Sequence, residues 1–262
     1  GQGQLDNISI DYFEQVSVFR GSTSILFGNA SGGAISFLSQ PPKSQNSTRS
    51  SMTMNSLSDR SLTFFMNRSQ NNIDWNFHVD IQKQKGHRYH SSSHSSILNF
   101  QLRYRSKHFE TLKFSFNHLH SPYALDPGSL TLEQKRNDPK MARPENELYD
   151  SRENVRQSKL SLRTQKVLND KIVLKTDIWF LQRSFKNKLP FQNGGQVNLL
   201  RNYFGFNSKL TYNIGVGKTF NKIMFGIEMN NQSDSRKRFD NIMGVKGNMS
   251  YNGEEKFMMA AS

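Results

Sequence analysis

The 262-residue chain contains no cysteine, so it has neither a disulfide framework nor a thiolate metal site. Long apolar runs are also missing, and the longest unbroken one is Phe257–Ala261. A transmembrane helix needs ~20 consecutive apolar residues, so none is expected. Only 34% of the residues are hydrophobic, which is low for a water-soluble core in a chain this long. A β-barrel is not excluded, because β-strands cross a membrane with ~9–11 residues of which only every second one is apolar.

Acidic residues are scarce relative to basic ones, 21 against 35, which gives a net charge of +14. Nucleic-acid binding is one consequence of such a charge, but Lys and Arg are scattered along the chain instead of forming one patch. We therefore expect no nucleic-acid partner, and anionic ligands or lipid headgroups explain the positive charge more simply. The sequence also has no G-x-S-x-G or H-E-x-x-H motif, so we expect neither an enzyme nor a cofactor.

Alternation of polar and apolar residues dominates the chain after residue 47. In Ile73–Gln82 every odd position is large and apolar and every even position is polar. A helix would scatter the apolar residues around its circumference, so this period of two predicts a β-strand. Similar runs predict about nine strands, at 47–57, 59–68, 73–82, 98–105, 112–117, 155–165, 172–180, 204–212 and 223–230.

The polar face of these runs carries Arg, Lys, Asp and His. A charge that faces lipid at the midplane costs ~2–4 kcal/mol, so these side chains are expected to face a lumen. For the clearest run, the sequence predicts lipid contact for Ile73, Trp75, Phe77, Val79 and Ile81, and a lumen or plug environment for Asp74, Asn76, His78 and Asp80.

The connections between the runs alternate in length after the first hairpin. Long segments at 83–94, 121–153 and 186–198 are separated by turns of a few residues. Outer-membrane barrels have short periplasmic turns and longer extracellular loops, so the long segments are expected outside the cell. Within the longest one, Thr131 and Gln134 form a capping box that predicts a short helix, and Asp138-Pro139 ends it.

The stretch Ile10–Gln40 has a different residue pattern, in which two short segments of alternating apolar residues flank a Gly- and Ser-rich middle. Its sequence, EQVSVFRGSTSILFGNASGGAIS from Glu14 to Ser36, resembles the end of the plug domain of TonB-dependent outer-membrane receptors. The match is carried by Glu14, Arg20, Gly21, Gly28, Gly32 and Gly33, together with Val16, Val18, Ser24, Leu26, Phe27 and Ile35. Ser17, Ser22 and Ser36 depart from the family pattern. Another β-protein with a Gly-rich turn is the alternative.

The resemblance implies an all-β fold: a partial transmembrane antiparallel β-barrel with the C-terminal part of an internal plug. We expect residues 1–40 to belong to the plug, 41–46 to form a linker, and 47–262 to form the first part of the barrel. Plugged transporters have 22 strands, so the chain is expected to be a piece of a longer protein.

The function implied is TonB-dependent import across a bacterial outer membrane. The phrase Asp126-Pro127-Gly128-Ser129-Leu130-Thr131 resembles a segment of siderophore-type receptors and favours a ferric siderophore over haem, cobalamin or a glycan. The implied partners are a TonB-type energising protein, the ferric siderophore and outer-membrane lipid. A porin or adhesin, and a soluble sugar-binding module, are alternatives of other classes.

Individual residues are assigned roles on two grounds. The resemblance implies that Arg20 locks the plug against acidic side chains of the barrel wall and that Glu14 joins this network; an ordinary surface arginine is the alternative. In the predicted loop GHRYH, His87, Arg88, Tyr89 and His90 are candidates for contact with an anionic or catecholate ligand, as is Tyr123. The loose histidine spacing does not favour a metal site.

Overall fold

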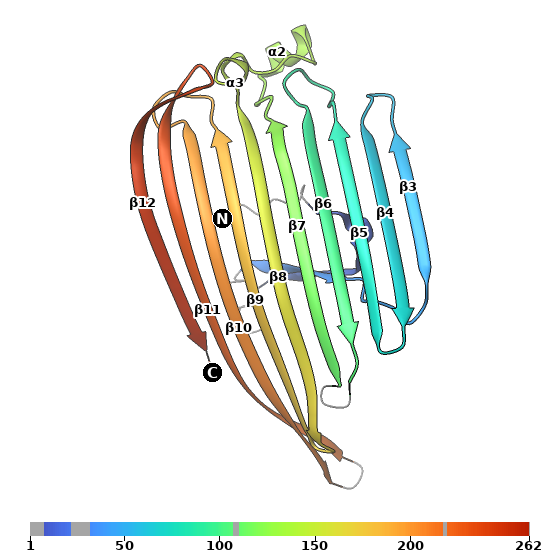
Figure 1. The fold of residues 1–262 in the computed structure, drawn as a ribbon. Coiled ribbons are helices and arrows are strands. Elements are labelled where there is room, and N and C mark those ends of the chain that lie inside the picture. Colours follow the sequence, from blue (N-terminus) through green and yellow to red (C-terminus); the bar gives the residue numbers. More distant parts are fainter. Residues whose placement is uncertain (1–7, 22–31, 107–109, 217–218, 262) are drawn as a thin grey trace.

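The computed structural model describes residues 8–21, 32–106, 110–216 and 219–261, which form two separate antiparallel sheets. The small sheet pairs β1 (Phe13–Arg20) with β2 (Gly33–Ser39) and is preceded by a 3-10 helix, η2 (Ile10–Tyr12). It lies behind the large sheet and crosses the direction of its strands (Figure 1).

The large sheet, called the wall below, is a ten-stranded meander in which each strand pairs with the next one along the chain. Its strands are β3 (Ser47–Met54), β4 (Arg60–Gln70), β5 (Ile73–Gln84), β6 (Ser93–Tyr104), β7 (Thr111–Leu125), β8 (Arg152–Asn169), β9 (Ile172–Lys188), β10 (Gln196–Val216), β11 (Thr219–Ile242) and β12 (Val245–Ala261). The wall is curved and open (Figure 1), so the predicted all-β, partial-barrel fold is confirmed. No helix in the described ranges has the length and apolarity needed to span a membrane.

All nine predicted runs are strands, but the expected number was too low because β12 was missed. In β12 residues of like character are adjacent, as in Glu254-Glu255 and Met258-Met259, so the period-two signal is weak. Its pairing with β11 is also interrupted by register shifts between Arg238 and Asn241. A bulge of this kind changes which face a residue occupies and hides a strand from pattern reading.

The two faces of the wall differ in chemistry in the way predicted for β5. Asp74, Asn76 and His78 are 0% exposed and Asp80 is 3% exposed, whereas Ile73 is 41% and Ile81 39% exposed. The polar residues of β5 face the small sheet, which defines the inner face of the wall. The apolar residues form the outer face, so the usual arrangement of a water-soluble sheet is reversed.

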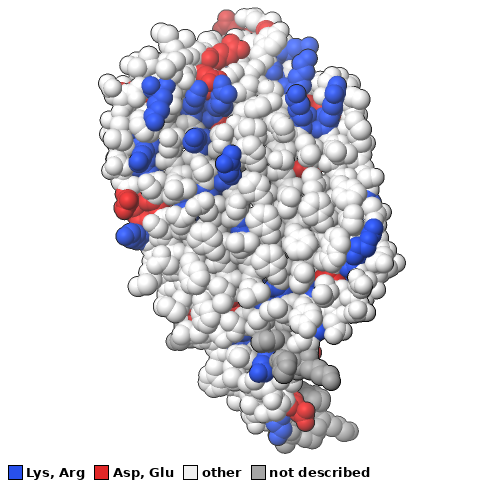
Figure 2. Space-filling model, viewed as in Figure 1, with Lys and Arg blue, Asp and Glu red and all other residues white. Residues whose placement is uncertain are grey.

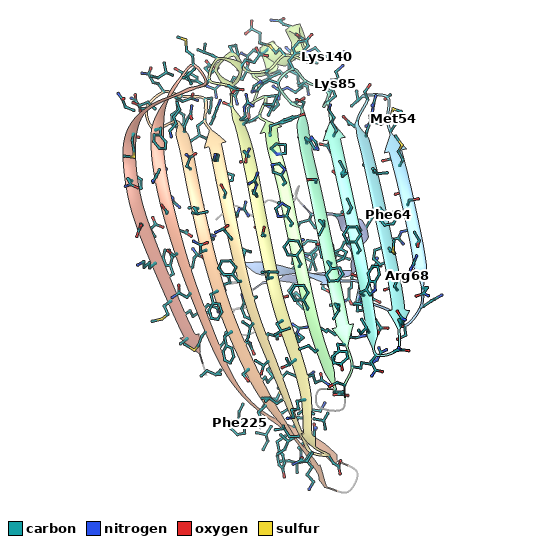
Figure 3. The ribbon with its side chains drawn as sticks, in the orientation of Figure 1. Met54, Phe64, Arg68, Lys85, Lys140 and Phe225 are labelled. Carbon is teal, nitrogen blue, oxygen red and sulfur yellow. The ribbon has the colours of Figure 1, made fainter. Side chains whose placement is uncertain are left out.

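Strand register builds the outer face into continuous apolar rows. One row runs across six strands through directly paired residues: Phe77, Phe100, Phe116, Leu160, Phe180 and Phe204. Figure 2 shows this face with its middle mostly free of charge, while Lys and Arg gather over the upper ends of the strands. Phe64 and Phe225 belong to the same set of apolar residues (Figure 3).

The connections divide between two ends of the wall. Segments 55–59, 85–92, 126–151, 189–195 and 243–244 lie at one end, the loop end, where Lys85 and Lys140 are seen in Figure 3. At the opposite end lie the short connections 71–72 and 170–171, while residues 107–109 and 217–218 lie outside the described residues. The predicted alternation of long and short therefore holds until the β11–β12 turn, which is short although it lies at the loop end. Met243 and Gly244 have φ of 48° and 86° there, as a tight hairpin requires.

The longest connection contains α2 (Leu132–Asn137) and α3 (Pro144–Leu148). The predicted capping box of α2 is confirmed. Gln134 N donates to Thr131 Oγ1 at 3.2 Å, and Thr131 N donates to Gln134 Oε1 at 2.9 Å. Asp138 is the C-terminal cap, so the helix ends where the sequence predicted.

Candidate functional site

The small sheet meets the inner face of the wall at the end where the start of β1 pairs with the end of β2. Tyr12 is 6% exposed, and its ring centroid lies 5.2 Å from that of His78 on β5. Burial raises the pKa of the Tyr12 phenol to about 12, although hydrogen bonds with Gln101 and Ser39 oppose the rise. Gln101 Nε2 in turn donates to Ser39 Oγ at 2.7 Å. A phenol held neutral in this way is a structural hydrogen-bonding group across the whole physiological pH range.

The segment that leaves the small sheet, 40–46, is held to the wall by asparagine side chains. Asn67 accepts from Lys43 N at 2.9 Å and donates to Lys43 O at 2.8 Å and to Gln45 O. Asn76 Nδ2 donates to Gln40 O at 2.9 Å. Pro41 and Pro42 have no N–H to satisfy, so this irregular backbone leaves few unpaired groups against the wall.

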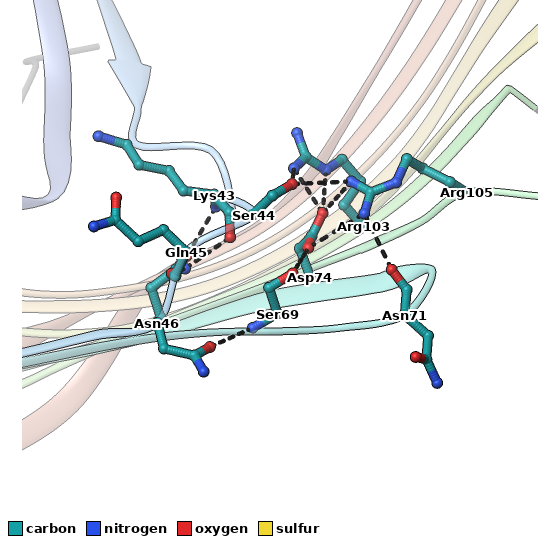
Figure 4. A network of polar contacts seen from close by, with 10 residues as sticks. Lys43, Ser44, Gln45, Asn46, Ser69, Asn71, Asp74, Arg103 and Arg105 are labelled. Atoms are coloured by element: carbon teal, nitrogen blue, oxygen red, sulfur yellow. Dashed lines mark hydrogen bonds and ion pairs between the residues drawn. The ribbon is translucent and has the colours of Figure 1, made fainter.

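A buried carboxylate, Asp74, is the centre of a network beside this segment (Figure 4). Arg103 donates to Asp74 Oδ2 from Nε at 2.9 Å and from Nη2 at 2.6 Å, and Arg105 also contacts this oxygen. Ser69 Oγ donates to Asp74 Oδ1 at 2.6 Å. Because the carboxylate is fully desolvated, these charge-assisted bonds are what make its burial tolerable.

Of the six predicted plug-motif residues, Gly28 lies outside the described residues. Gly21 has φ of 86°, and Gly33 has φ of 133°, with a position for a Cβ only 2.5 Å from Phe19 O, so both positions require glycine. Gly32 shows no such requirement in its surroundings. Glu14 and Arg20 are exposed on β1. Within the described ranges no carboxylate forms an ion pair with Arg20, so its predicted lock stays a prediction.

The predicted ligand-contacting loop is tied to the longest connection by Arg88. Its guanidinium donates to Pro127 O at 3.0 Å, Gly128 O at 2.7 Å and Met141 O at 3.0 Å. Tyr89 N also donates to Lys140 O at 2.7 Å. Arg88 therefore donates three of its five guanidinium N–H groups within the protein, and it joins segments that are about 40–50 residues apart in sequence.

The other predicted ligand residues are not brought together into one site. His87 is exposed, Tyr89 is 58% exposed, and His90 Nε2 lies 2.9 Å from Ser151 O. Tyr123 lies on β7 and packs edge-on against His94 at 6.3 Å between ring centroids. Among the described residues no cluster of three or more His, Asp or Glu forms a candidate metal site.

Two features at the loop end were missed in the sequence. Asn241 is 0% exposed, and its Nδ2 donates to Tyr149 O at 2.8 Å and Leu189 O at 3.0 Å. Its Oδ1 accepts from Gly244 N at 3.0 Å, so this one side chain connects three loop-end segments. The second feature is Asp150, whose carboxylate forms ion pairs with Arg152 and Lys188. Desolvation alone would raise the pKa of this carboxyl, but the hydrogen bonds from Lys188 and Arg152 outweigh desolvation and lower the pKa.

A cavity of about 790 Å³ separates the small sheet from the inner face of the wall. The small-sheet side contributes Glu14, Phe13 and Phe37, and the wall side is mostly polar. Its charged wall residues are Lys113, Lys159, Arg163 and Asp177. The cavity is therefore lined by residues from elements at the beginning and in the middle of the chain.

An open wall that is apolar outside and polar inside, with a small sheet on its polar side, is the arrangement of a partial β-barrel that holds a small sheet against its inner face. No known protein-family profile matches the chain. Solved structures do match. The siderophore receptor PiuA from Acinetobacter baumannii has a TM-score of 0.69 at 15% identity, covering 92% of this chain and 38% of that one.

Two further structures give the same result. The unliganded ferric citrate transporter FecA has a TM-score of 0.74 at 16% identity, covering 97% of this chain and 40% of that one. The pyoverdine outer-membrane receptor FpvA from Pseudomonas aeruginosa PAO1, bound to pyoverdine, has a TM-score of 0.79 at 10% identity, covering 96% and 42%. The chain therefore spans 38% to 42% of the length of these proteins. At the level of the fold, the resemblance inferred from the sequence is confirmed.

Proposed function

We propose that the chain belongs to a TonB-dependent receptor of the bacterial outer membrane that imports a ferric siderophore. In this proposal residues 1–40 are the end of the plug, 41–46 are the linker, and 47–262 are the first part of the barrel. The observation that carries it is the reversed wall, with buried Asp74, Asn76 and His78 on the side of the small sheet and exposed apolar rows on the other. A surface of that kind requires lipid as its solvent.

The loop end is proposed to face the outside of the cell, and the ends with short turns the periplasm. A passive porin is disfavoured because the polar face is occupied by the small sheet and its anchored linker. The siderophore is supported by the Asp126–Thr131 phrase and by the proteins of similar fold, which are a siderophore receptor, a ferric citrate transporter and a pyoverdine receptor. The proposed partners are the energising protein, outer-membrane lipid and the iron complex.

Uptake of radioactive iron by iron-starved cells tests the function. Deletion of the gene that encodes the full-length protein should abolish energy-dependent uptake of at least one ferric siderophore, and a plasmid copy should restore it. Uptake that is unchanged for every siderophore that the wild-type cells use would contradict the proposal. Cysteine at Phe114 and at Ser115, probed with lipid-soluble and water-soluble reagents, tests the membrane orientation, because Ser115 lines the cavity of the inner face and Phe114 lies on the outer face. Equal aqueous labelling of the two positions would exclude a lipid-facing wall.

For Arg20 we retain the role of a lock between plug and barrel, with a partner carboxylate outside the described residues. Arg20→Ala should then increase the leak of small antibiotics or lower uptake while leaving ligand binding at the cell surface unchanged. Arg20→Lys should rescue poorly because an ammonium cannot make a two-pronged contact with a carboxylate. Wild-type leak and uptake in both variants, at matched surface levels, would make Arg20 a bystander.

A further inference from the structure

The outer face of the wall changes character between its apolar rows and the loop end. On β9 the mostly apolar outer positions from Ile172 to Phe180 pair directly with those from Tyr212 to Phe204 on β10. This stretch of a strand rises about 27 Å. At the usual strand tilt it accounts for most of the ~25 Å apolar band that an outer-membrane barrel presents to lipid. The rows beyond Phe180 and Phe204 therefore begin where the hydrocarbon of the membrane ends.

Three further rows of directly paired residues cover this part of the outer face, and all but one of their members are polar. Across β7–β11 the first row is His118, Ser158, Gln182, Asn202 and Ser233, and the second is His120, Arg156, Ser184, Leu200 and Ser235; across β8–β11 the third is Asn154, Lys186, Asn198 and Lys237. Within the first row, His118 Nδ1 lies 2.9 Å from Ser158 Oγ, and Gln182 Nε2 donates to Asn202 Oδ1 at 3.0 Å. These three rows are called the polar collar below.

The polar collar contains cations but no acid. Arg156, Lys186 and Lys237 are exposed. Among the described residues, no carboxylate forms an ion pair with any of the three. The first acid that the same rows reach is Glu254 on β12, opposite Ser235. Figure 2 shows the resulting accumulation of Lys and Arg over the upper ends of the strands. Such a surface attracts anions.

The height of these cations above the apolar rows indicates which kind of anion they meet. Arg156 is four residues beyond Leu160, and Lys186 is six residues beyond Phe180. These separations are about 13 and 20 Å along the strand, or about 10 and 15 Å along the membrane normal at the usual tilt. The headgroup layer of a phospholipid leaflet is only ~5–7 Å thick, so it covers the first row of the collar and ends below the cations. A saccharide headgroup that carries phosphates is tall enough to reach them.

We propose that the polar collar binds the headgroup of a phosphorylated glycolipid of the outer leaflet, with its phosphates on Arg156, Lys186 and Lys237. The inference rests on the proposed membrane location and on the loop end facing outwards. Lys186 is a diagonal neighbour of Arg156, ~7–8 Å away, and lies two strands, ~10 Å, from Lys237. Two phosphates of one headgroup can therefore contact neighbouring cations. Ser184 and Asn198, which lie beside Lys186, offer a hydroxyl and an amide to the sugar hydroxyls.

Lipid binding is measured on the full-length protein in detergent micelles by native mass spectrometry. The probe is a bisphosphorylated diglucosamine lipid, and it is compared with the same lipid without phosphates and with phosphatidylglycerol. The wild type should bind the bisphosphorylated lipid at least tenfold more tightly than either, because only this lipid brings phosphates to the height of the cations. The bisphosphorylated disaccharide without acyl chains should not compete at equal concentration, because it makes no contact with the apolar rows.

Variants separate the collar from the rest of the protein. Arg156→Gln, Lys186→Gln and Lys237→Gln should each weaken binding of the bisphosphorylated lipid about fivefold to tenfold, the effect of one lost charge-assisted contact. Lys186→Arg should retain binding. Lys171→Gln is the matched control, because it removes an exposed charge from the 170–171 turn at the opposite end of the wall.

The outcomes against the proposal are distinct. Unchanged affinity in the three glutamine variants, or an equal loss in Lys171→Gln, would overturn the site. Equal binding of phosphatidylglycerol would overturn the glycolipid assignment, and full competition by the soluble disaccharide would overturn the membrane as the source of the ligand. Failure of the transport function is distinguishable, because cells would then take up no iron complex while the purified protein still bound the phosphorylated lipid.

Discussion

The outer and inner faces of the wall are made from alternating residues of the same strands, yet they are stabilised in opposite ways. On the outer face the paired rows of Phe and Leu are exposed, with Phe180 at 42% and Phe204 at 47%. On the inner face Asp74 and Asp234 are at most 1% exposed and are held by arginine. A sheet that buries its carboxylates and exposes its aromatic rings is adapted to two solvents, one of them lipid.

The two faces also differ in which side chains they accept. Any apolar side chain of similar size satisfies the outer face, because lipid makes no directional demand. The inner face depends on particular partners, such as Asn67 for the linker backbone and Arg103 for Asp74. Substitutions should therefore be costly on the inner face when they remove a partner, and costly on the outer face when they add a charge.

The largest effect is expected for Asp74→Ala. The change leaves Arg103 and Arg105 facing each other without the carboxylate, and loss of one member of a buried ionic group costs about 3–4 kcal/mol. Thermal unfolding of the full-length protein in micelles measures the loss. Glu133→Ala, which removes an exposed carboxylate of α2, is the control. Equal melting temperatures of Asp74→Ala and wild type would show that the inner face is not held by this network.

Adjacent residues of β7 test the outer face directly. Phe114→Arg places a guanidinium in the apolar rows and should cost about 2–3 kcal/mol, whereas Ser115→Arg places it in the cavity of the inner face and should cost much less. Folding yield into lipid vesicles, measured by resistance of the barrel to protease, ranks the two variants. The interpretation of the faces fails if Ser115→Arg is the more damaging change.

The strands of the wall and the α2 capping box were predictable because both signals are local. Alternation over ten residues and the spacing of Thr131 and Gln134 need no knowledge of distant neighbours. β12 was missed where a bulge and adjacent like residues removed the alternation.

Contacts between distant segments explain the remaining misses in the candidate site. GHRYH gives no sign that the Arg88 guanidinium binds carbonyls of Pro127, Gly128 and Met141. Nor does the sequence around Asn67 or Asn241 show that each amide holds backbone far along the chain.

A smaller effect is expected for Asn67→Leu, which removes the side chain that holds the 43–45 backbone. Unpaired Lys43 N and Gln45 O next to the wall should cost about 1–2 kcal/mol. Cleavage by trypsin after Lys43 should become faster as the linker detaches. Asn72→Leu, in the exposed turn between β4 and β5, is the matched control. Unchanged cleavage in Asn67→Leu would mean that the linker is held by other contacts.

The smallest expected effect is a pH dependence at the loop end, where Asp150 joins Arg152 and Lys188. Lys188 Nζ lies 2.6 Å from Asp150 Oδ2 and 2.8 Å from Gly244 O, so it links the longest connection to the β11–β12 turn. The pKa of Asp150 is lowered from 3.8 in the folded state, because bonds from Lys188 and Arg152 outweigh desolvation. The stabilisation is therefore fully present above pH 3.8 and is lost as the pH falls from there through the lower folded pKa. Because the group is partly exposed, the loss should stay below about 1 kcal/mol.

Amide hydrogen exchange of residues 149–152 and 243–246 at pH 5 and pH 3, corrected for the intrinsic rate, measures this loss of stability. Protection should fall at pH 3 in the wild type and should be low at both pH values in Asp150→Asn. A wild-type pH dependence that persists in Asp150→Asn would assign the effect to another carboxylate.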